Sequence, residues 1–439
     1  MKELTRRQFI KTSSGALAAA TVSPLAAFGK QKVAPSDTVN VALIGCRNMG
    51  FGDLQHALKV NGVNCIGLCD VDQNILERRA SDVKESAGNS PILYRDYRKL
   101  LENKDLDAVI IGTPDHWHCL QTVHSLEAGK HVYVEKPMAN TIAEIDVMKK
   151  ATNYYGKVVQ VGQQQRSGEH WKKIANIVQS GDLGKIRTVN LWGNYNYGIG
   201  PERTENSPVP DGVDYDMWLG PAANRPFNSS RYHRWWRFFW AYGGGVQTDW
   251  GTHLLDIALM AMEVEGPPNS VHSNGGIFSG KNHDIEVADT QTTTYAFNDF
   301  NMVWQHVGGL ETGPYNRNYG IAFVGNNGTL VVNRGGWEII PVHDDEDKPL
   351  IEPVPNQEGR GSNHDIHVKN YIESIRGNET PNCPVEAGHL AALYAHLGNL
   401  SYLSGDTLKW YSNGNLINEN KYSSIIKPEY RGPWTFPQI

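Results

Sequence analysis

The stretch VALIGCRNMGFGD, residues 41–53, decides the fold of the first part of the chain. An apolar run leads into Gly45, and Gly50 follows five residues later. Glycines at this spacing, between a strand and a helix, are typical of a loop whose backbone approaches the pyrophosphate of a dinucleotide. The position that usually carries a middle glycine holds Arg47 instead. The loop therefore predicts a dinucleotide site with one departure from the usual pattern.

Apolar strand-like segments continue along the chain and alternate with helix-compatible ones such as TIAEIDVMKKATNYY. This alternation predicts βαβ units around a parallel sheet. The strand-like segments are VNCIGLCD (63–70), LDAVIIGTP (106–114), GKHVYVEKP (129–137) and GKVVQVG (156–162).

Asp70 ends the second strand-like segment, 20 residues after Gly50. An acidic residue there accepts hydrogen bonds from the adenosine ribose, and its charge repels a 2′-phosphate. Asp70 therefore favours NAD over NADP. Arg47 leaves two alternatives open, because its guanidinium either contacts the phosphates or points to solvent while only its backbone is used.

Composition sets the broad class of the protein. The 439 residues include 40% hydrophobic and 20% charged residues, which indicates a soluble globular chain of two or more domains. The net charge of -6 gives no reason to expect nucleic acid as a partner. Five cysteines without a CxxC pair indicate neither a zinc finger nor a disulfide framework, so we expect them to be small buried residues.

The N-terminal segment TRRQFIKTSSGALAAATVSPLAAFG (5–29) resembles a twin-arginine (Tat) export signal. Its apolar run is too short and interrupted to span a bilayer, and a disordered basic tail is the alternative. We expect a periplasmic protein whose mature chain begins between about residues 28 and 36 and contains no membrane span. Because this route exports folded proteins, a nucleotide bound before export would have to be held tightly.

Three motifs occur in order along the chain: TPDHWH (113–118), EKP (135–137) and GGGVQTDWGTHLLD (243–256). Together they resemble the Gfo/Idh/MocA family of oxidoreductases, which includes glucose–fructose oxidoreductase and inositol dehydrogenase. The resemblance covers some 400 residues. It implies that the T-P-x-x-x-H segment lies beside the nicotinamide and that the lysine of E-K-P lies in the active site.

The same residues suggest the chemistry. Asp249 and His253 are four apart, so on a helix they would share one face, where the carboxylate could orient the imidazole. Lys136 could stabilise a developing alkoxide. By resemblance, His253 is the base, Lys136 its partner at the oxygen, and Asp249 completes the catalytic site. The alternative is an ordinary surface lysine and a surface pair on a helix. The spacings His116-x-His118 and Asp249-x-x-x-His253 also fit metal ligands, but no third cluster joins these two, and no metal is predicted.

Two sets of binding residues are predicted around these three. The SRYHRWWRFFWAYGGG segment (230–245) is dense in aromatic rings that stack on sugars, although core packing is an equal alternative. The QVGQQQRS segment (160–167) ends a strand near the expected site. The predicted cofactor-binding residues are Gly45, Arg47, Asn48, Met49, Gly50, Asp70, Thr113, Pro114, His118, Glu135 and Lys136. The predicted substrate-binding residues are Lys136, Gln165, Arg166, Tyr232, His233, Trp235, Asp249 and His253.

The second half of the chain changes pattern. Segments 186–198, 288–307 and 318–340 alternate apolar and polar residues, as half-buried antiparallel strands do, and NNGT (326–329) is hairpin-like. The predicted fold class is α/β, with an N-terminal Rossmann domain and a C-terminal α+β domain with a large, mainly antiparallel open sheet. The predicted bounds are 1–35 for the signal and linker, 36–162 for the first domain and 163–439 for the second. Late helices near 364–377 and 384–405 are expected to pack back toward the first domain.

The leading hypothesis is an exported NAD-dependent oxidoreductase acting on a sugar or polyol hydroxyl, in a cycle that returns its own hydride because free cofactor is scarce outside the cytoplasm. The alternative is an NAD-dependent glycoside hydrolase that works through a transient keto-sugar, with Tyr197, Tyr232 or His233 as a further acid or base. A cofactor-loaded binding protein without turnover is disfavoured by the presence of all three catalytic candidates. By resemblance we expect a homo-oligomer, a dimer or tetramer.

Overall fold

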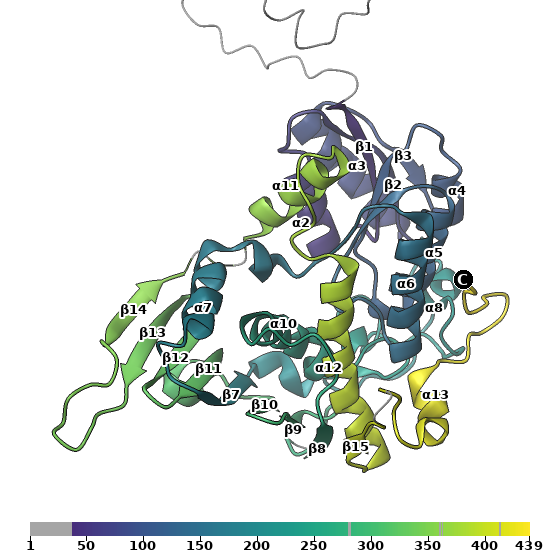
Figure 1. Cartoon of the computed structure of the whole chain (residues 1–439). Coiled ribbons are helices and arrows are strands. Elements are labelled where there is room, and N and C mark those ends of the chain that lie inside the picture. Colours follow the sequence, from purple (N-terminus) through teal and green to yellow (C-terminus); the bar gives the residue numbers. More distant parts are fainter. Residues whose placement is uncertain (1–36, 280–281, 360, 362, 412–413) are drawn as a thin grey trace, which may run out of the picture. The chain divides into compact units, whose positions relative to one another are not determined.

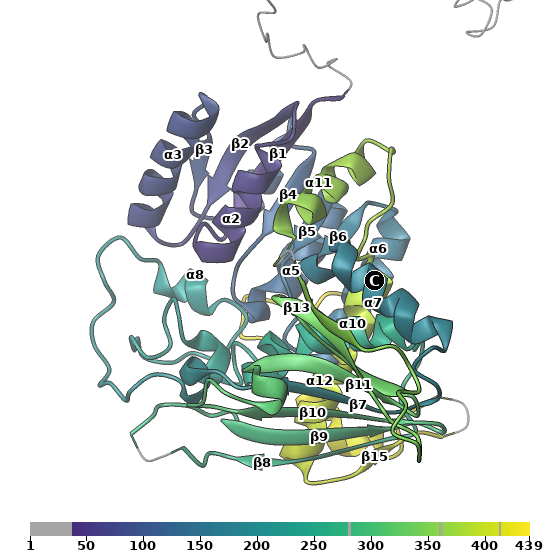
Figure 2. The ribbon, with the colours of Figure 1, turned by 90° about the vertical axis from the view of Figure 1, so that its left-hand side faces the viewer.

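The computed structural model describes residues 37–279, 282–359, 361, 363–411 and 414–439, and the predicted export signal lies outside them. Its first sheet is parallel, and the strand order is β3-β2-β1-β4-β5-β6 (β1 to β3 are labelled in Figure 1 and all six strands in Figure 2). This is the doubly wound order in which a dinucleotide lies where the order reverses, here between β1 and β4. The strands are β1 (Val39–Ile44), β2 (Val63–Cys69), β3 (Ile92–Tyr94), β4 (Ala108–Ile111), β5 (His131–Val134) and β6 (Val159–Val161).

The helices of this domain connect the strands, as the alternating sequence predicts. The side chains of β4 are all buried, as expected for a parallel strand covered on both faces. Helix α3 begins after Asp72, whose carboxylate caps the amides of Asn74 and Ile75. The helices are α2 (Asn48–Ala57), α3 (Gln73–Ala87), α4 (Tyr97–Leu101), α5 (Asp115–Glu127) and α6 (Ile142–Tyr155).

A second sheet has the order β14-β13-β12-β11-β7-β10-β9-β8-β15, and its pairs are antiparallel except for β7 with β10 (Figure 2). The predicted fold class is confirmed, and the hairpin predicted at 326–329 joins β11 to β12. The strands are β7 (Ile186–Gly193), β8 (Ser270–Gly276), β9 (Thr290–Ala296), β10 (Asn301–Val307), β11 (Tyr319–Gly325), β12 (Gly328–Asn333), β13 (Gly336–Pro341), β14 (Val354–Glu358) and β15 (Leu408–Lys409).

The remaining helices lie against this sheet or return to the first domain. Helix α12 contacts both α6 and β8, and α11 packs on α2. Val368, Tyr371 and Ile372 of α11 are fully buried in the core of the first domain, so the late helices pack back as predicted. The α-helices are α7 (Glu169–Ser180), α8 (Tyr215–Leu219), α9 (Gly245–Asp249), α10 (Gly251–Ala261), α11 (His364–Ile375), α12 (Val385–Ser404) and α13 (Ser423–Ile426). The 3₁₀ helices are η2 (Gln164–Ser167), η3 (Asn196–Ile199), η4 (Trp236–Phe238), η5 (Pro314–Asn316) and η6 (Glu419–Tyr422).

Three further observations concern the described residues. All five cysteines are buried and free of disulfides, as the sequence predicts. Within the part of the chain that the structure describes, no helix is both long enough and apolar enough to cross a bilayer. The same residues contain no group of three or more His, Cys, Asp or Glu side chains arranged to hold a metal ion.

Candidate functional site

A cavity of about 410 Å³ lies at the carboxyl ends of β1, β2, β4 and β5, at the reversal of strand order. Residues from both domains line it. From the first domain these include nine of the predicted cofactor-binding residues: Gly45, Arg47, Asn48, Met49, Asp70, Thr113, Pro114, Glu135 and Lys136. From the second domain they are Tyr197, Met217, Trp218, His233, Arg234, Trp235, Trp236, Arg237 and Asp249.

The floor of the cavity is a close contact among three glycines. Gly45 has φ +88°, and a Cβ there would lie 2.7 Å from the carbonyl carbon of Gly112. A Cβ on Gly50 would lie 2.5 Å from the Gly45 oxygen. The loop therefore needs glycine at both predicted positions. Gly50 supports the loop from behind and does not line the cavity.

The groups above this floor fit a dinucleotide. Helix α2 begins directly after Arg47, whose side chain does not cap the helix. The first backbone N–H groups of α2 therefore have no side-chain partner from the cap and can bind phosphate. Asp70 accepts hydrogen bonds from the amides of Cys46 at 2.7 Å and Asp72 at 3.0 Å. A carboxylate has about four acceptor positions, which leaves two for ribose hydroxyls. Asp70 thus holds the glycine loop in addition to its predicted role.

A set of contacts that we call the latch, in which Arg47 and His233 both bind Asp72, joins the two domains beside this end of the cavity. The Arg47 guanidinium lies 2.8 Å from Oδ2 of Asp72, and Nε2 of His233 lies 3.1 Å from the same oxygen. Val213 pairs with Asp72 as an antiparallel bridge, and the Gly212 oxygen accepts the Gln73 amide at 3.0 Å. We call residues 212–214 the strap. Contact between Arg47 and the cofactor phosphates stays a prediction. The Arg47 guanidinium also binds Asp72, and this ion pair is part of the latch.

Replacement of Asp72 by asparagine is expected to loosen the latch. Asparagine also caps a helix, so α3 keeps its N-cap, while the ion pair with Arg47 is lost. We expect bound NAD to dissociate roughly tenfold faster, corresponding to about 1.4 kcal/mol, as measured by the NAD left per chain during dialysis. Asp96→Asn is the matched control, since Asp96 also caps a helix and pairs with an arginine, but its partner Arg98 does not line the cavity as Arg47 does. Equal retention in both variants would exclude the latch.

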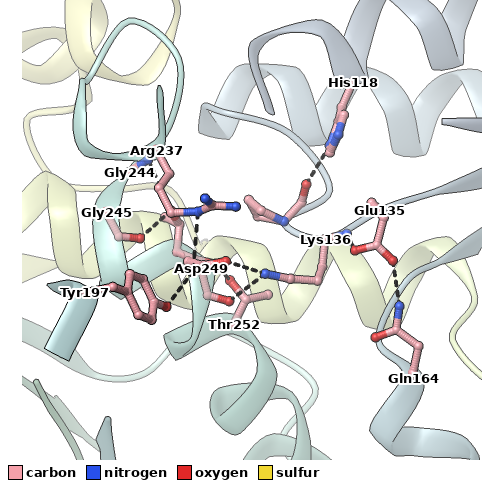
Figure 3. Close-up of polar contacts among 12 residues, drawn as sticks. His118, Glu135, Lys136, Gln164, Tyr197, Arg237, Gly244, Gly245, Asp249 and Thr252 are labelled. Carbon is pink, nitrogen blue, oxygen red and sulfur yellow. Dashed lines mark hydrogen bonds and ion pairs between the residues drawn. The ribbon is translucent and has the colours of Figure 1, made fainter. Parts of the chain in front are cut away.

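At the other end of the cavity, three side chains converge on Asp249 (Figure 3). The Lys136 ammonium lies 2.5 Å from Oδ1, the Tyr197 hydroxyl donates to Oδ2 at 2.9 Å, and Nε of Arg237 lies 3.4 Å from Oδ2. Burial alone would raise the pKa of Asp249, but Lys136 and Arg237 outweigh it and hold that pKa well below the usual range. Burial and then Asp249 raise the pKa of Tyr197, so its hydroxyl keeps its proton.

The predicted pair of Asp249 and His253 is not formed. Helix α9 ends at Asp249 and α10 begins at Gly251, and the carboxylate turns to Lys136, because an ammonium attracts it more strongly than a neutral imidazole. His253 packs edge-on against Trp250, and its Nδ1 is buried without a hydrogen-bond partner. Burial, and then Lys136, lower the pKa of His253 well below the ordinary value, which keeps the imidazole neutral.

Five other predicted residues, with His253, do not line the cavity wall. Arg166 is held by Asp256 through two contacts of 2.8 and 3.0 Å, and Gln165 accepts a hydrogen bond from Arg334. Tyr232 is buried among Trp218, Phe227 and Tyr215. His118 bridges the Thr113 and Pro137 oxygens, so it positions the two loops. The fifth is Gly50, described above. In contrast, Trp235 and His233 do line the wall, with His233 at the latch.

Gly112 and Arg237 are among the residues of this site that sequence reasoning missed. Gly112 forms one side of the glycine contact, and its only local signal is its position before Thr113 in the strand-end motif. Arg237 stacks its guanidinium 4.6 Å over Trp236 and lies beside Asp249. It belongs to the aromatic segment 230–245, but no local pattern shows which of its arginines faces the cavity.

Comparison with known families decides what kind of protein this is. A model described as "Oxidoreductase family, NAD-binding Rossmann fold" matches residues 39–163, and one described as "Oxidoreductase family, C-terminal alpha/beta domain" matches residues 167–306. The chain belongs to the Gfo/Idh/MocA oxidoreductase family. Its first domain is an NAD-binding Rossmann domain, as the glycine loop and Asp70 predict.

Relatives add detail. A glycosyl hydrolase family 109 protein of Shewanella baltica is 29% identical over 206 residues, which are 42% of this chain and 45% of that protein. The chain thus matches less than half the length of this curated relative. Levoglucosan dehydrogenase, solved with NADH and levoglucosan, has a TM-score of 0.64 at 19% identity over 85% of this chain and 99% of that one. An aldose–aldose oxidoreductase from Caulobacter crescentus, solved with glycerol, has a TM-score of 0.61 at 18% identity over the same shares. These two likenesses show the fold.

Proposed function

We propose that this protein is an NAD-dependent oxidoreductase that acts on a hydroxyl group of a sugar or polyol and keeps its cofactor through a redox-neutral cycle. The observation that carries the proposal is the Lys136–Asp249 ion pair, which lines the same cavity as the glycine loop. When bound there, NAD supplies the hydride acceptor and donor. The strap supports a cofactor that stays in place, and the name of the aldose–aldose oxidoreductase neighbour fits a cycle between two sugars.

The chain's own residues divide the remaining tasks. Lys136 holds the substrate oxygen and stabilises its negative charge, and Asp249 keeps the ammonium in position. Asp249 is a poor proton acceptor, because a carboxylate whose pKa is held low is a weak base. His253, which the family resemblance assigns as the base, remains the proposed acceptor of the hydroxyl proton. Its imidazole is neutral, but its lowered pKa makes it a weak base, so the proposal relies on Lys136 to make the substrate hydroxyl more acidic. The rings of Trp235 and Trp236 offer faces on which the C–H side of a sugar stacks.

A second candidate is an NAD-dependent glycoside hydrolase, as the likeness to a glycosyl hydrolase family 109 protein suggests. The chemistry needs an additional acid or base near the glycosidic bond. Of the three side chains proposed from the sequence, Tyr197 is the one hydrogen-bonded to Asp249 and lining the cavity beside Lys136. Its protonated hydroxyl fits the role of the acid.

One experiment separates the two functions. Purified protein is incubated with a panel of sugars and aryl glycosides while nicotinamide absorbance and aglycone release are followed. Reduction of bound NAD by one sugar, reversed by a second, is the expected result. Aglycone release without net NADH supports the hydrolase. If neither occurs and His253→Ala changes nothing measured, the catalytic proposal fails.

Export is a proposal that bears on this cycle, and homo-oligomeric assembly is a separate proposal. The twin-arginine segment falls in residues 1–36, outside the described ones. A periplasmic location, which cell fractionation would check, favours a cofactor that does not exchange. Sedimentation would check the proposed homo-oligomer.

A further inference from the structure

Arg237 lies in the wall of the cavity and, within the described part of the chain, has no carboxylate of its own. Its Nε is 3.4 Å from Oδ2 of Asp249, and this buried nitrogen makes no hydrogen bond to any described residue. Lys136 and Tyr197 hold the two oxygens of Asp249 at 2.5 and 2.9 Å. In the other arginine–carboxylate ion pairs of the described residues the contact is 2.5–2.8 Å. Asp249 is therefore bound mainly by Lys136 and Tyr197, and the charge of Arg237 is only partly compensated.

Two further acidic residues lie near this end of the cavity, and neither of them neutralises Arg237. Glu135 lies on the side of Lys136 that faces away from Arg237, where it accepts the Gln164 amide at 2.5 Å (Figure 3). Asp115, the first residue of α5, is 3% exposed. Burial raises the pKa of Asp115 well above the ordinary value, although the charge of Arg237 lowers it. Asp115 therefore holds its proton and carries no charge at neutral pH.

The guanidinium of Arg237 is held in a way that leaves several of its N–H groups available. It stacks 4.6 Å over the ring of Trp236, and its Nη1 donates to the Arg234 oxygen at 2.9 Å. A guanidinium has five N–H groups. Since one binds Arg234 and the Nε group faces Asp249, three on Nη1 and Nη2 remain. A stacked, planar guanidinium with free N–H groups matches a carboxylate, which accepts two parallel hydrogen bonds.

We propose that Arg237 is a specificity-determining residue that binds a carboxylate of the substrate, so that the preferred substrates are sugar acids, such as aldonic or uronic acids. This inference deepens the proposed function and rests on it. Lys136 and Arg237 reach the same residue, Asp249, from the two domains (Figure 3). A hydroxyl group held by Lys136 and a carboxylate held by Arg237 can thus belong to one small molecule. A neutral sugar leaves the N–H groups of Arg237 without an acceptor, and a site built for a polar group discriminates strongly against an analogue that lacks it.

The first measurement is binding, because binding does not depend on turnover. The protein, in saturating NAD and at constant ionic strength, is titrated with gluconate, glucuronate, the neutral counterparts glucitol and glucose, and glucose 6-phosphate. Quenching of tryptophan fluorescence reports binding, since Trp235 and Trp236 line the cavity. We expect at least one sugar acid to bind about 10–100-fold more tightly than its neutral counterpart, the range for a hydrogen bond to a charged group.

Three variants assign this preference to one side chain. Arg237→Gln removes the charge and keeps a planar amide, and the preference for the acid should fall to within about twofold. Arg237→Lys keeps a charge beside Asp249 but loses the planar fork, so it should keep only part of the preference. Arg98→Gln is the matched control, since Arg98 also stacks on a tryptophan, 4.8 Å over Trp434, and pairs with a carboxylate but does not line the cavity. Its preference should equal that of the wild type.

The proposal is overturned if neither sugar acid binds more tightly than its neutral counterpart, or if Arg237→Gln keeps the preference. It is also overturned if glucose 6-phosphate binds more tightly than both acids and loses this advantage in Arg237→Gln, because the recognised anion would then be a phosphate. If Arg237→Gln does not fold, Arg237→Lys decides, and an undiminished preference in that variant overturns the proposal.

The binding data also separate this proposal from the proposed function. An acid preference that Arg237→Gln abolishes, in a protein whose bound NAD no sugar reduces, supports the carboxylate site and contradicts the oxidoreductase. Reduction of NAD by a neutral sugar, without any preference for an acid, supports the oxidoreductase and overturns the carboxylate site.

Discussion

Turnover should fall by about 10²–10³-fold when Lys136 is replaced by methionine, the loss typical for removal of one group that stabilises a developing oxyanion. Methionine keeps an unbranched side chain of similar length and removes the ammonium that lies 2.5 Å from Asp249. The substrate oxygen then has no cation beside it, although Arg237 and Tyr197 still hold Asp249. The measurement is the initial rate on whichever sugar reduces the bound NAD, together with NAD per chain to separate catalysis from cofactor loss.

Lys99→Met is the matched control for that change. Lys99 also forms an ion pair with a carboxylate, Glu102, but it does so on the exposed surface of α4, away from the cavity. We expect its rate to equal that of the wild type. A Lys136→Met protein that retains NAD and turns over within a few-fold of the wild type would remove Lys136 from the mechanism.

Replacement of Gly50 by alanine should abolish NAD retention and destabilise the first domain by about 1–3 kcal/mol. The new Cβ would lie 2.5 Å from the Gly45 oxygen and 3.1 Å from Cα of Gly112. Both neighbours are backbone, so the loop itself has to move away from the position that phosphate requires. Thermal unfolding and NAD content together measure the effect.

The same helix provides a matched control. A Cβ on Gly52 meets nothing within 4 Å. Gly52→Ala should therefore keep NAD and gain about 0.5–1 kcal/mol of stability, because alanine suits a helix interior better than glycine. If Gly50→Ala binds NAD as Gly52→Ala does, the close contact of the three glycines is not needed for the site.

The sequence predicted the first domain well because its signals are local. The run before Gly45, the spacing to Gly50 and the strand-end Asp70 each act within one βαβ unit, and the structure places all three as expected. Five of the nine predicted residues that line the cavity in this domain belong to the glycine loop and the strand-end aspartate, whereas Thr113, Pro114, Glu135 and Lys136 were predicted from the family resemblance.

The second half of the site depends on contacts between distant segments. Lys136 and Asp249 are 113 residues apart, and helical spacing alone suggested His253 as the partner of Asp249. Lys136 lies too far from Asp249 along the sequence for any helical or strand periodicity to reveal it as the partner. Likewise, the strap at 212–214 lies in a stretch rich in proline and polar residues, with no period that indicates pairing with Asp72.

The strap also changes what kind of catalyst this would be. Most dehydrogenases borrow their nicotinamide for one turnover and release it to a shared pool. Residues 212–214 are tied to the loop that follows Asp70, because the Asp214 amide donates to the Val71 oxygen at 2.9 Å and Val213 pairs with Asp72. A dinucleotide whose adenosine ribose is bound by Asp70 would leave slowly while these contacts hold. In the proposed redox-neutral cycle it would be a resident prosthetic group in the manner of a flavin. The oxidation of one sugar and the reduction of a second would then use the same bound NAD. The second sugar, and not a pool of free NAD, would regenerate the cofactor.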